Sequence, residues 1–207
     1  TRDRQRVIVQ ATAADGLTRD VTGEATFSVE HPDKATFEDG RLRPLADGDT
    51  RLRVEVGGQT LTVPVHVERA GEDPPVSFKM DVMPVFMRAG CNTGSCHGAA
   101  RGKDGFRISL FGFDPDGDHH RLTREFSGRR LNLALAEESL LMEKATGAVP
   151  HSGGAKIKKG DQYHATLLRW LESGAVNDPG PVPAVVKVEI DPPTAVLDGQ
   201  GATQRFI

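Results

Sequence analysis

LRVEVGGQTLTVPVHV, the stretch from Leu52 to Val67, carries the clearest structural signal in the chain. Apolar residues occupy every second position on both sides of Gly57-Gly58, which is the pattern of a strand with one buried face. Two glycines between such runs are typical of the tight turn of a β-hairpin. The stretch therefore predicts two antiparallel strands joined at Gly57-Gly58.

Shorter runs upstream continue this β pattern. Residues 7–9 and, apart from Ser28, residues 25–29 are apolar or β-branched. Asp15-Gly16 separates the two runs, and the polar residues 31–34 follow the second. Short strands at such spacing are typical of a small β-sandwich. We expect one over residues 1–72.

The pattern changes after Asp73-Pro74-Pro75, where the apolar spacing becomes that of helices. A second, all-α domain is expected over residues 76–178. Asp118 and Gly128 are expected to bound one of its helices, and Asp161 is the expected N-cap of the last. The predicted helices are one that carries Phe78, Val82, Val85, Phe86 and Ala89 on one face, and three at about 118–127, 137–145 and 161–173.

The last part of the chain returns to a β pattern. A proline-rich linker at 179–183 precedes the alternating residues 185–190, and Gln204–Ile207 resembles the sequence of Gln5–Ile8. Residues 184–207 are therefore predicted to begin a second sandwich. They are too few to bury a core, so we expect further domains of the same polypeptide.

Composition excludes several function classes. The 207 residues are 37% hydrophobic with a net charge of −3, which is the profile of a globular chain without the positive field that nucleic-acid binding needs. No apolar run approaches the roughly 18 residues of a membrane span, and no charged-then-apolar leader opens the chain at Thr1. We expect no nucleic-acid partner and no transmembrane segment. Aromatic residues are only 5%, so a bound cofactor is one way to fill the core.

Both cysteines of the chain lie in one short segment, Cys91-Asn92-Thr93-Gly94-Ser95-Cys96-His97. Two thiols followed directly by a histidine are the arrangement that attaches haem covalently, with the imidazole as the proximal iron ligand. The usual gap between the cysteines is two residues, and here it is four. We expect Gly94 to let the four-residue loop bulge outward, because glycine readily adopts positive φ.

Three other interpretations of this segment remain open. Cys91 and Cys96 can form a disulfide in an oxidising compartment, although the small loop would gain little stability from it. Cys91, Cys96 and His97 with one more histidine can supply four zinc ligands, although the three lie close together in the sequence. The thiols can also simply be free and buried.

The segment and its surroundings resemble the planctomycete-type cytochrome c domain, in which a four-residue gap between the haem cysteines is an accepted form. The resemblance covers about residues 77–178, and the segments on either side resemble bacterial Ig-like domains more loosely. The matching stretches are DVMPVF at 81–86, AGCNTGSCHG at 89–98, ESLL at 138–141, TGAVPH at 146–151 and WLESGA at 170–175.

The resemblance implies a multidomain β + α fold: an Ig-like β-sandwich, an all-α cytochrome c-like domain, and the first strands of a second Ig-like domain. It implies one covalent haem c per chain, bound through Cys91, Cys96 and His97, and an electron-transfer module rather than an enzyme. Phosphate-binding glycine loops, serine-nucleophile elbows and HExxH helices are not found in the sequence. Haem c is attached outside the bacterial cytoplasm, so a periplasmic, cell-surface or secreted protein is expected.

A second axial ligand is needed if the iron is to transfer electrons with little rearrangement. His151 is our prediction, because it follows Val149-Pro150 at the place where small cytochromes carry a ligating methionine. Met142 is the alternative, while His164, His119 and His120 are weaker candidates. Basic residues at 129–130 and 156–159 are expected to be solvated, or else to bind haem propionates or an acidic redox partner.

Two alternative functions also stand. The first is an extracellular adhesion or binding module with a Cys91–Cys96 disulfide and no cofactor. The second is a haem-based sensor whose sixth iron position is open or displaceable. The resemblance implies a redox partner, either a protein or a cofactor.

Overall fold

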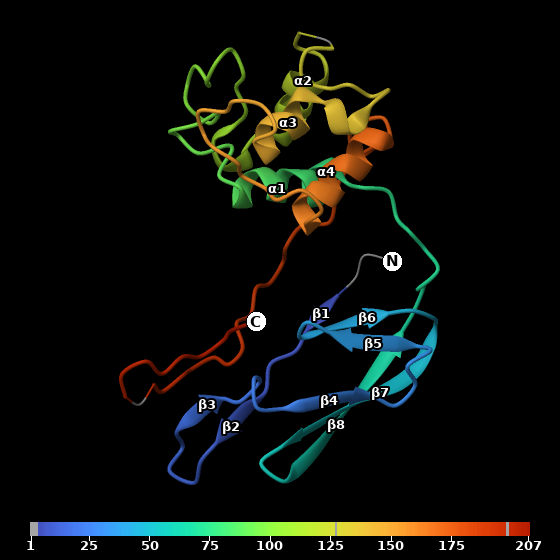
Figure 1. The fold of residues 1–207 in the computed structure, drawn as a ribbon, viewed down its shortest axis with the longest axis vertical. Helices are drawn as coiled ribbons and strands as arrows, with labels where there is room; N and C mark the ends of the chain where they lie inside the picture. Colours follow the sequence, from blue (N-terminus) through green and yellow to red (C-terminus); the bar gives the residue numbers. More distant parts are fainter. Residues whose placement is uncertain (1–3, 127, 198) are drawn as a thin grey trace. The chain divides into compact units, whose positions relative to one another are not determined.

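A computed structural model describes residues 4–126, 128–197 and 199–207 (Figure 1). The chain forms two compact units, one of Thr1–Pro74 with Val185–Ile207 and one of Pro75–Ala184. The described strands belong to the first unit and the described helices to the second. Within the described residues no helix is both long enough and apolar enough to cross a membrane.

The first unit contains eight described strands in three antiparallel sheets. The sheets have the orders β1-β6-β5, β2-β3 and β4-β7-β8. The strands are β1 (Gln5–Arg6), β2 (Gln10–Thr12), β3 (Thr18–Asp20), β4 (Thr26–Val29), β5 (Ala35–Glu38), β6 (Arg41–Pro44), β7 (Gly48–Val56) and β8 (Gln59–Val67).

The predicted hairpin is confirmed. Strands β7 and β8 pair from Gly48↔Val67 to Val56↔Gln59, which leaves Gly57-Gly58 as the turn, both at positive φ. Alternate side chains of β7 are buried, as the sequence pattern predicted. Two of them, Leu52 and Val54, belong to a core of buried residues from two of the sheets and from the segments beside the strands: Val9, Val21, Ala35, Leu42, Leu52, Val54, Val67 and Ala70.

The second unit is built from short helices joined by long loops. A π-helical turn, η1 (Phe78–Val82), leads into α1 (Met83–Arg88). The other helices are α2 (Pro115–Thr123), α3 (Leu140–Thr146), α4 (Gln162–Glu172) and the single turns η2 (Leu110–Gly112) and η3 (Ala136–Glu138).

Helix α4 begins as predicted, whereas α2 begins earlier. The Asp161 carboxylate accepts a hydrogen bond from His164 N at 2.8 Å, which confirms it as the N-cap of α4. The cap of α2 is Asp114, which accepts from Gly117 N. Asp118 lies inside that helix, fully buried, and accepts hydrogen bonds from Ser109 N and Arg121 Nη1. A second aspartate four residues upstream therefore takes the role predicted for Asp118.

The helices of the second unit bury a continuous apolar core. Phe78 and Trp170 lie at its centre with their ring centroids 5.3 Å apart, and Trp170 Nε1 donates to Val176 O. This core joins the start of α1 to the last helix, α4, although the two are far apart in the sequence. It holds in place the end of α1, from which the cysteine segment continues.

The predicted fold class, an Ig-like β-sandwich followed by an all-α cytochrome c-like domain and the start of a second Ig-like domain, is wrong. The described residues form eight strands in three small sheets and only four short α-helices. Three sheets of two or three strands are not the two stacked sheets of a sandwich. Alternation in the sequence identified strands, but it does not determine how strands are shared among sheets.

The predicted strands at 185–190 and 204–207 are also wrong. No strand is described from 184 to 207, and Val185–Ile207 belongs to the same compact unit as Thr1–Pro74. Val186 is 96% exposed, and Val188 and Ile190 are exposed as well. An alternating run forms a strand only where a partner ladder satisfies its backbone, and the described residues give it none.

Candidate functional site

The cysteine segment follows α1 and folds back on itself as a tight loop. Cys91 N donates to Phe86 O at 2.9 Å, and His97 N donates to Cys91 O at 3.0 Å, so both ends of the motif meet. Gly98 allows this closure, because a Cβ atom there would overlap the backbone carbonyl of Asn92. Gly94, which we expected at positive φ, is not among the glycines with positive φ.

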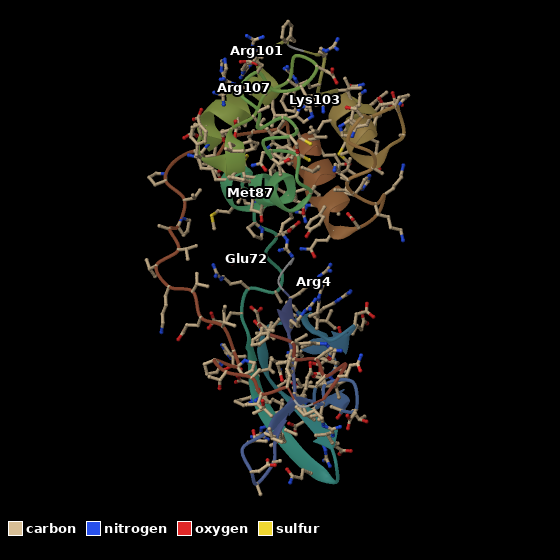
Figure 2. The ribbon with its side chains drawn as sticks, turned by 90° about the vertical axis from the view of Figure 1, so that its left-hand side faces the viewer. Arg4, Glu72, Met87, Arg101, Lys103 and Arg107 are labelled. Atoms are coloured by element: carbon tan, nitrogen blue, oxygen red, sulfur yellow. The ribbon has the colours of Figure 1, made fainter. Side chains whose placement is uncertain are left out.

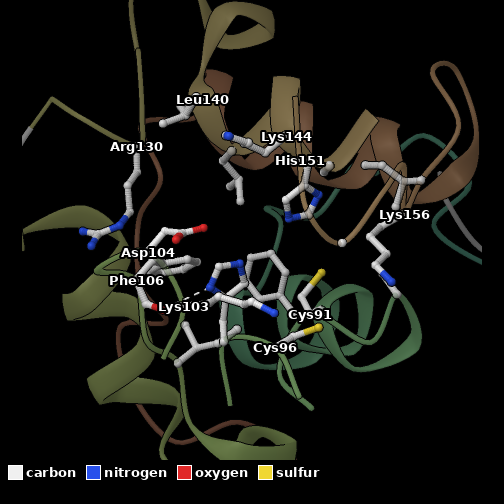
Figure 3. Close-up of a pocket in the computed structure, with 18 of the residues that line it drawn as sticks. Cys91, Cys96, Lys103, Asp104, Phe106, Arg130, Leu140, Lys144, His151 and Lys156 are labelled. Atoms are coloured by element: carbon white, nitrogen blue, oxygen red, sulfur yellow. Dashed lines mark hydrogen bonds between the residues drawn. The ribbon is translucent and has the colours of Figure 1, made fainter. Parts of the chain in front are cut away.

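Both thiols are free and half-buried, and both line one cavity. Burial raises the pKa of Cys91 to about 11, so this sulfur is a protonated thiol at neutral pH. Figure 3 shows the Cys91 and Cys96 sulfurs close together at one end of the cavity. The loop thus presents two thiols to the same space.

His97 is held in the cavity wall by a backbone carbonyl. Its Nδ1 lies 3.0 Å from Phe106 O, and a carbonyl oxygen can only accept, so Nδ1 carries the proton. Phe106 sits in a narrow turn whose N–H and C=O groups pair with those of Lys103. Desolvation by burial lowers the pKa of His97, which favours the neutral ring with an unprotonated Nε2.

Figure 2 shows how this turn lies in the second unit. Arg101, Lys103 and Arg107 extend from it, and all three side chains are exposed. Gly102 lets the turn close, because a Cβ at that position would overlap Phe106 O. The turn therefore combines a charged outer surface with a backbone that fixes the ring of His97.

His151 comes from the loop between α3 and α4 and has the same kind of support. Its Nδ1 lies 2.9 Å from Gly154 O, so Nε2 is again the free nitrogen. Lys144 Nζ donates to Pro150 O at 2.5 Å and ties the loop to α3. A Cβ on Gly153 would lie 3.1 Å from the His151 ring, so a side chain there would crowd the ring.

The structure brings His97 and His151 together across the cavity. Their ring centroids are 6.4 Å apart and their planes differ by only 7°. Two imidazoles, each with its Nδ1 hydrogen-bonded to a backbone carbonyl, therefore line one cavity.

The rest of the cavity wall is largely apolar. The space among its side chains is about 1200 Å³, part of it open to solvent. Apolar walls around a few polar groups are typical of a cofactor pocket. The apolar lining comes from α1, α3, α4 and the intervening loops: Val85, Phe86, Ala89, Phe106, Ile108, Leu140, Leu141, Ala145, Ile157 and Leu167.

The other candidate ligands lie elsewhere. Met142 is only 1% exposed and belongs to the apolar core, not to the cavity wall. His164 Nε2 is 3.5 Å from a Glu137 oxygen, and His119 Nε2 is bonded to Ala175 O. His120 is exposed on α2 and, like His119 and His164, does not line the cavity.

The competing interpretations of the cysteine segment can be compared with this geometry. In the part of the chain that the structure describes, no three or more histidine, cysteine or acidic side chains gather in a way that would hold a metal ion by themselves. The four-ligand zinc site is therefore not assembled. The disulfide is not formed either, since both sulfurs are free.

Sequence reasoning missed the parts of the site that come from the backbone. The carbonyl groups of Phe106 and Gly154, which orient the two imidazoles, carry no side-chain signature. Arg130 was treated as part of a surface charge run, although it is buried against the cavity. Its position after Gly128, just beyond the end of a predicted helix, gave no indication of burial.

No protein-family model matches the chain, and neither a curated protein nor a solved structure matches it. The assignment of a function therefore rests on the residues of the cavity and on their geometry.

Proposed function

We propose that this chain binds one haem covalently through Cys91 and Cys96, with His97 and His151 as the axial ligands of its iron, and that it carries electrons. The observation that supports this most directly is that the rings of His97 and His151 are nearly parallel, with their centroids 6.4 Å apart. Both rings line the cavity that the two thiols also line.

The residues fit the group in three respects. Metal–imidazole bonds are about 2 Å long, so two imidazoles on opposite sides of one metal atom have ring centres about 6 Å apart. Each imidazole has its Nδ1 proton held by a carbonyl, the support that ligating histidines usually have. The free thiols lie at one end of the cavity, and His97, which follows them in sequence, lines the same cavity.

Each part of the chain would then have a defined task. Cys91 and Cys96 would hold one edge of the porphyrin, and the carbonyls of Phe106 and Gly154 would fix the orientation of the two imidazoles through their Nδ1 atoms. The apolar side chains of α1 and α3 would exclude water from the porphyrin faces. When bound, haem supplies a one-electron redox centre, and two protein ligands leave no iron position for a substrate. This supports a carrier rather than an enzyme or a sensor.

Location and partners follow from the proposed attachment chemistry. Haem c is attached outside the cytoplasm in bacteria, so we propose a periplasmic, cell-surface or secreted protein. Its partner would be a redox protein or redox cofactor that approaches the second unit, which contains the whole cavity.

The test is to produce the chain in cells that attach haem and to measure its intact mass and its alkaline pyridine spectrum. We expect one haem per chain and a low-spin spectrum. His151→Ala should convert that spectrum to high-spin, because one axial ligand is lost. His120→Ala, an exposed histidine outside the cavity, is the matched control and should leave the spectrum unchanged. A polypeptide mass without haem from such cells would refute the proposal.

A further inference from the structure

The cavity has two chemically different ends. Figure 3 shows Cys91, Cys96 and Lys156 at one end and Arg130 far from them at the other, with His151 between. Lys144 lies on the Arg130 side of His151 in the same view. The thiol end and the Arg130 end are therefore separated by the length of the cavity.

Arg130 is a buried cation, and the acidic side chain that acts on its charge, Glu125, is exposed. Its side chain lines the cavity although the residue is only 7% exposed, and no ion pair of the described residues includes it. Its guanidinium donates to the backbone carbonyls of Arg121, Glu125 and Gly105 and lies 4.7 Å from the centre of the Phe106 ring. Three of its five N–H groups are used in this way, and carbonyls do not neutralise its charge.

Other cations line the same cavity. Arg129 is exposed beside Arg130, and Lys144 and Lys103 line the wall as well, whereas Asp104 is the single carboxylate among the described lining residues. A buried charge is normally paired with an opposite charge, because its desolvation is costly otherwise. Figure 3 shows Asp104 at the Arg130 end of the cavity and Lys103 nearer the thiols. The cations of the Arg130 end, which are Arg130, its neighbour Arg129 and Lys144, still outnumber this carboxylate, and the excess indicates an anionic ligand there.

We infer that Arg130, with Arg129 and Lys144, binds the two carboxylates of the porphyrin. This inference rests on the proposed function. Protoporphyrin carries its vinyl groups on one edge and its carboxylates on the opposite edge, so sulfurs bonded at the thiol end place the carboxylates at the Arg130 end. The cations thereby set the orientation in which the porphyrin presents its vinyl groups to Cys91 and Cys96 before the thioether bonds form.

The experiment uses the full chain with Cys91→Ala and Cys96→Ala, so that porphyrin binds reversibly. The protein is titrated with iron protoporphyrin IX and with its dimethyl ester, and binding is followed by the low-spin absorbance spectrum. We expect the diacid to bind about tenfold more tightly than the ester, because charge-assisted hydrogen bonds form only with the free carboxylates. Arg130→Gln should remove most of this preference and leave ester binding unchanged.

Lys158→Gln is the matched control, since Lys158 is an exposed cation that does not line the cavity, and it should keep the full preference. Arg130→Gln removes the donor of three backbone carbonyls, so its folding is checked by circular dichroism. If this variant is unfolded, the double variant Arg129→Gln, Lys144→Gln is used in its place, and it should also reduce the preference for the diacid. Equal binding of diacid and ester by the parent chain would overturn the inference and leave the proposed function standing. Failure of both porphyrins to give a low-spin spectrum would instead refute the proposed axial pair.

Discussion

Gly98 is the residue at which the attachment loop closes on itself. A Cβ there would overlap Asn92 O and crowd Thr93 O, and backbone atoms cannot move aside as a flexible side chain can. The position follows the motif directly, so its requirement for glycine comes from backbone crowding and not from ligation. The sequence alone drew attention to Gly94 instead.

Gly98→Ala is therefore expected to lower the free energy of unfolding of the second unit by about 1–3 kcal/mol, the usual cost of overpacking. It should also reduce the fraction of chains that carry haem, measured by intact mass. Gly94→Ala is the matched control, because its Cβ would meet only Leu110 Cδ1 at 3.9 Å. Equal stability and equal haem content of the two variants would contradict this account of the loop.

At the scale of single elements, the N-cap of α4 is a local feature that the sequence did reveal. Asp161 accepts from His164 N and also from Lys158 N, so its carboxylate joins the helix start to the preceding turn. We expect Asp161→Ala to cost about 1 kcal/mol of stability, seen as a lower Tm in thermal unfolding. Asp161→Asn retains an acceptor and should lose much less. A Tm of Asp161→Ala equal to that of the parent chain would show that the cap contributes nothing.

The β7–β8 hairpin carries a pH-dependent contact on its exposed face. His66 pairs with Asp49 across the two strands, and its Nδ1 lies 2.6 Å from the Asp49 carboxylate. This hydrogen bond, with a second that His66 Nε2 donates to the Glu68 carboxylate, raises the pKa of His66 above its ordinary value of 6.5. The contact therefore stabilises the fold fully below that ordinary value, and its contribution is lost as the pH rises through the raised value in the folded state.

We expect the Tm of the first unit to fall as the pH rises through this window, and His66→Gln to reduce that dependence. His31→Gln is the control, since it removes a histidine of the same unit that has no described ion pair. The titration of His66 itself can be followed by NMR. A midpoint at or below the ordinary histidine value would contradict the predicted direction.

At the scale of the whole molecule, the sequence predicted which residues form strands or helices better than it predicted how they assemble. The Leu52–Val67 hairpin follows from period and turn chemistry, both of which are local. The exposure of Val186 could not be predicted in this way. An alternating run forms a strand only beside a partner strand, and whether a partner is present depends on the complete fold. The two cysteines and His97 were found because they are adjacent in sequence, and His151 through a resemblance. The role of Arg130 became visible only in the structure, which shows that this residue is buried and lines the cavity.

Because the whole cavity lies within Pro75–Ala184, this unit is expected to bind haem by itself. Expressed alone in cells that attach haem, residues 75–184 should give the same low-spin spectrum as the full chain. Residues 1–74 should remain colourless and serve as the control. A folded fragment 75–184 without haem would show that residues outside the second unit take part in attachment.

The support of both imidazoles by main-chain oxygens has a consequence for how this protein can change over generations. Replacing the side chain at 106 leaves the oxygen that orients His97 in place, whereas Gly154 lies at a φ of 70°, which favours glycine. Drift at position 106 would alter the surroundings of the His97 ring while preserving its tautomer, and position 154 is expected to remain glycine. The geometry of the pair is thus encoded in the path of the chain, and it can outlast the loss of recognisable sequence likeness around it.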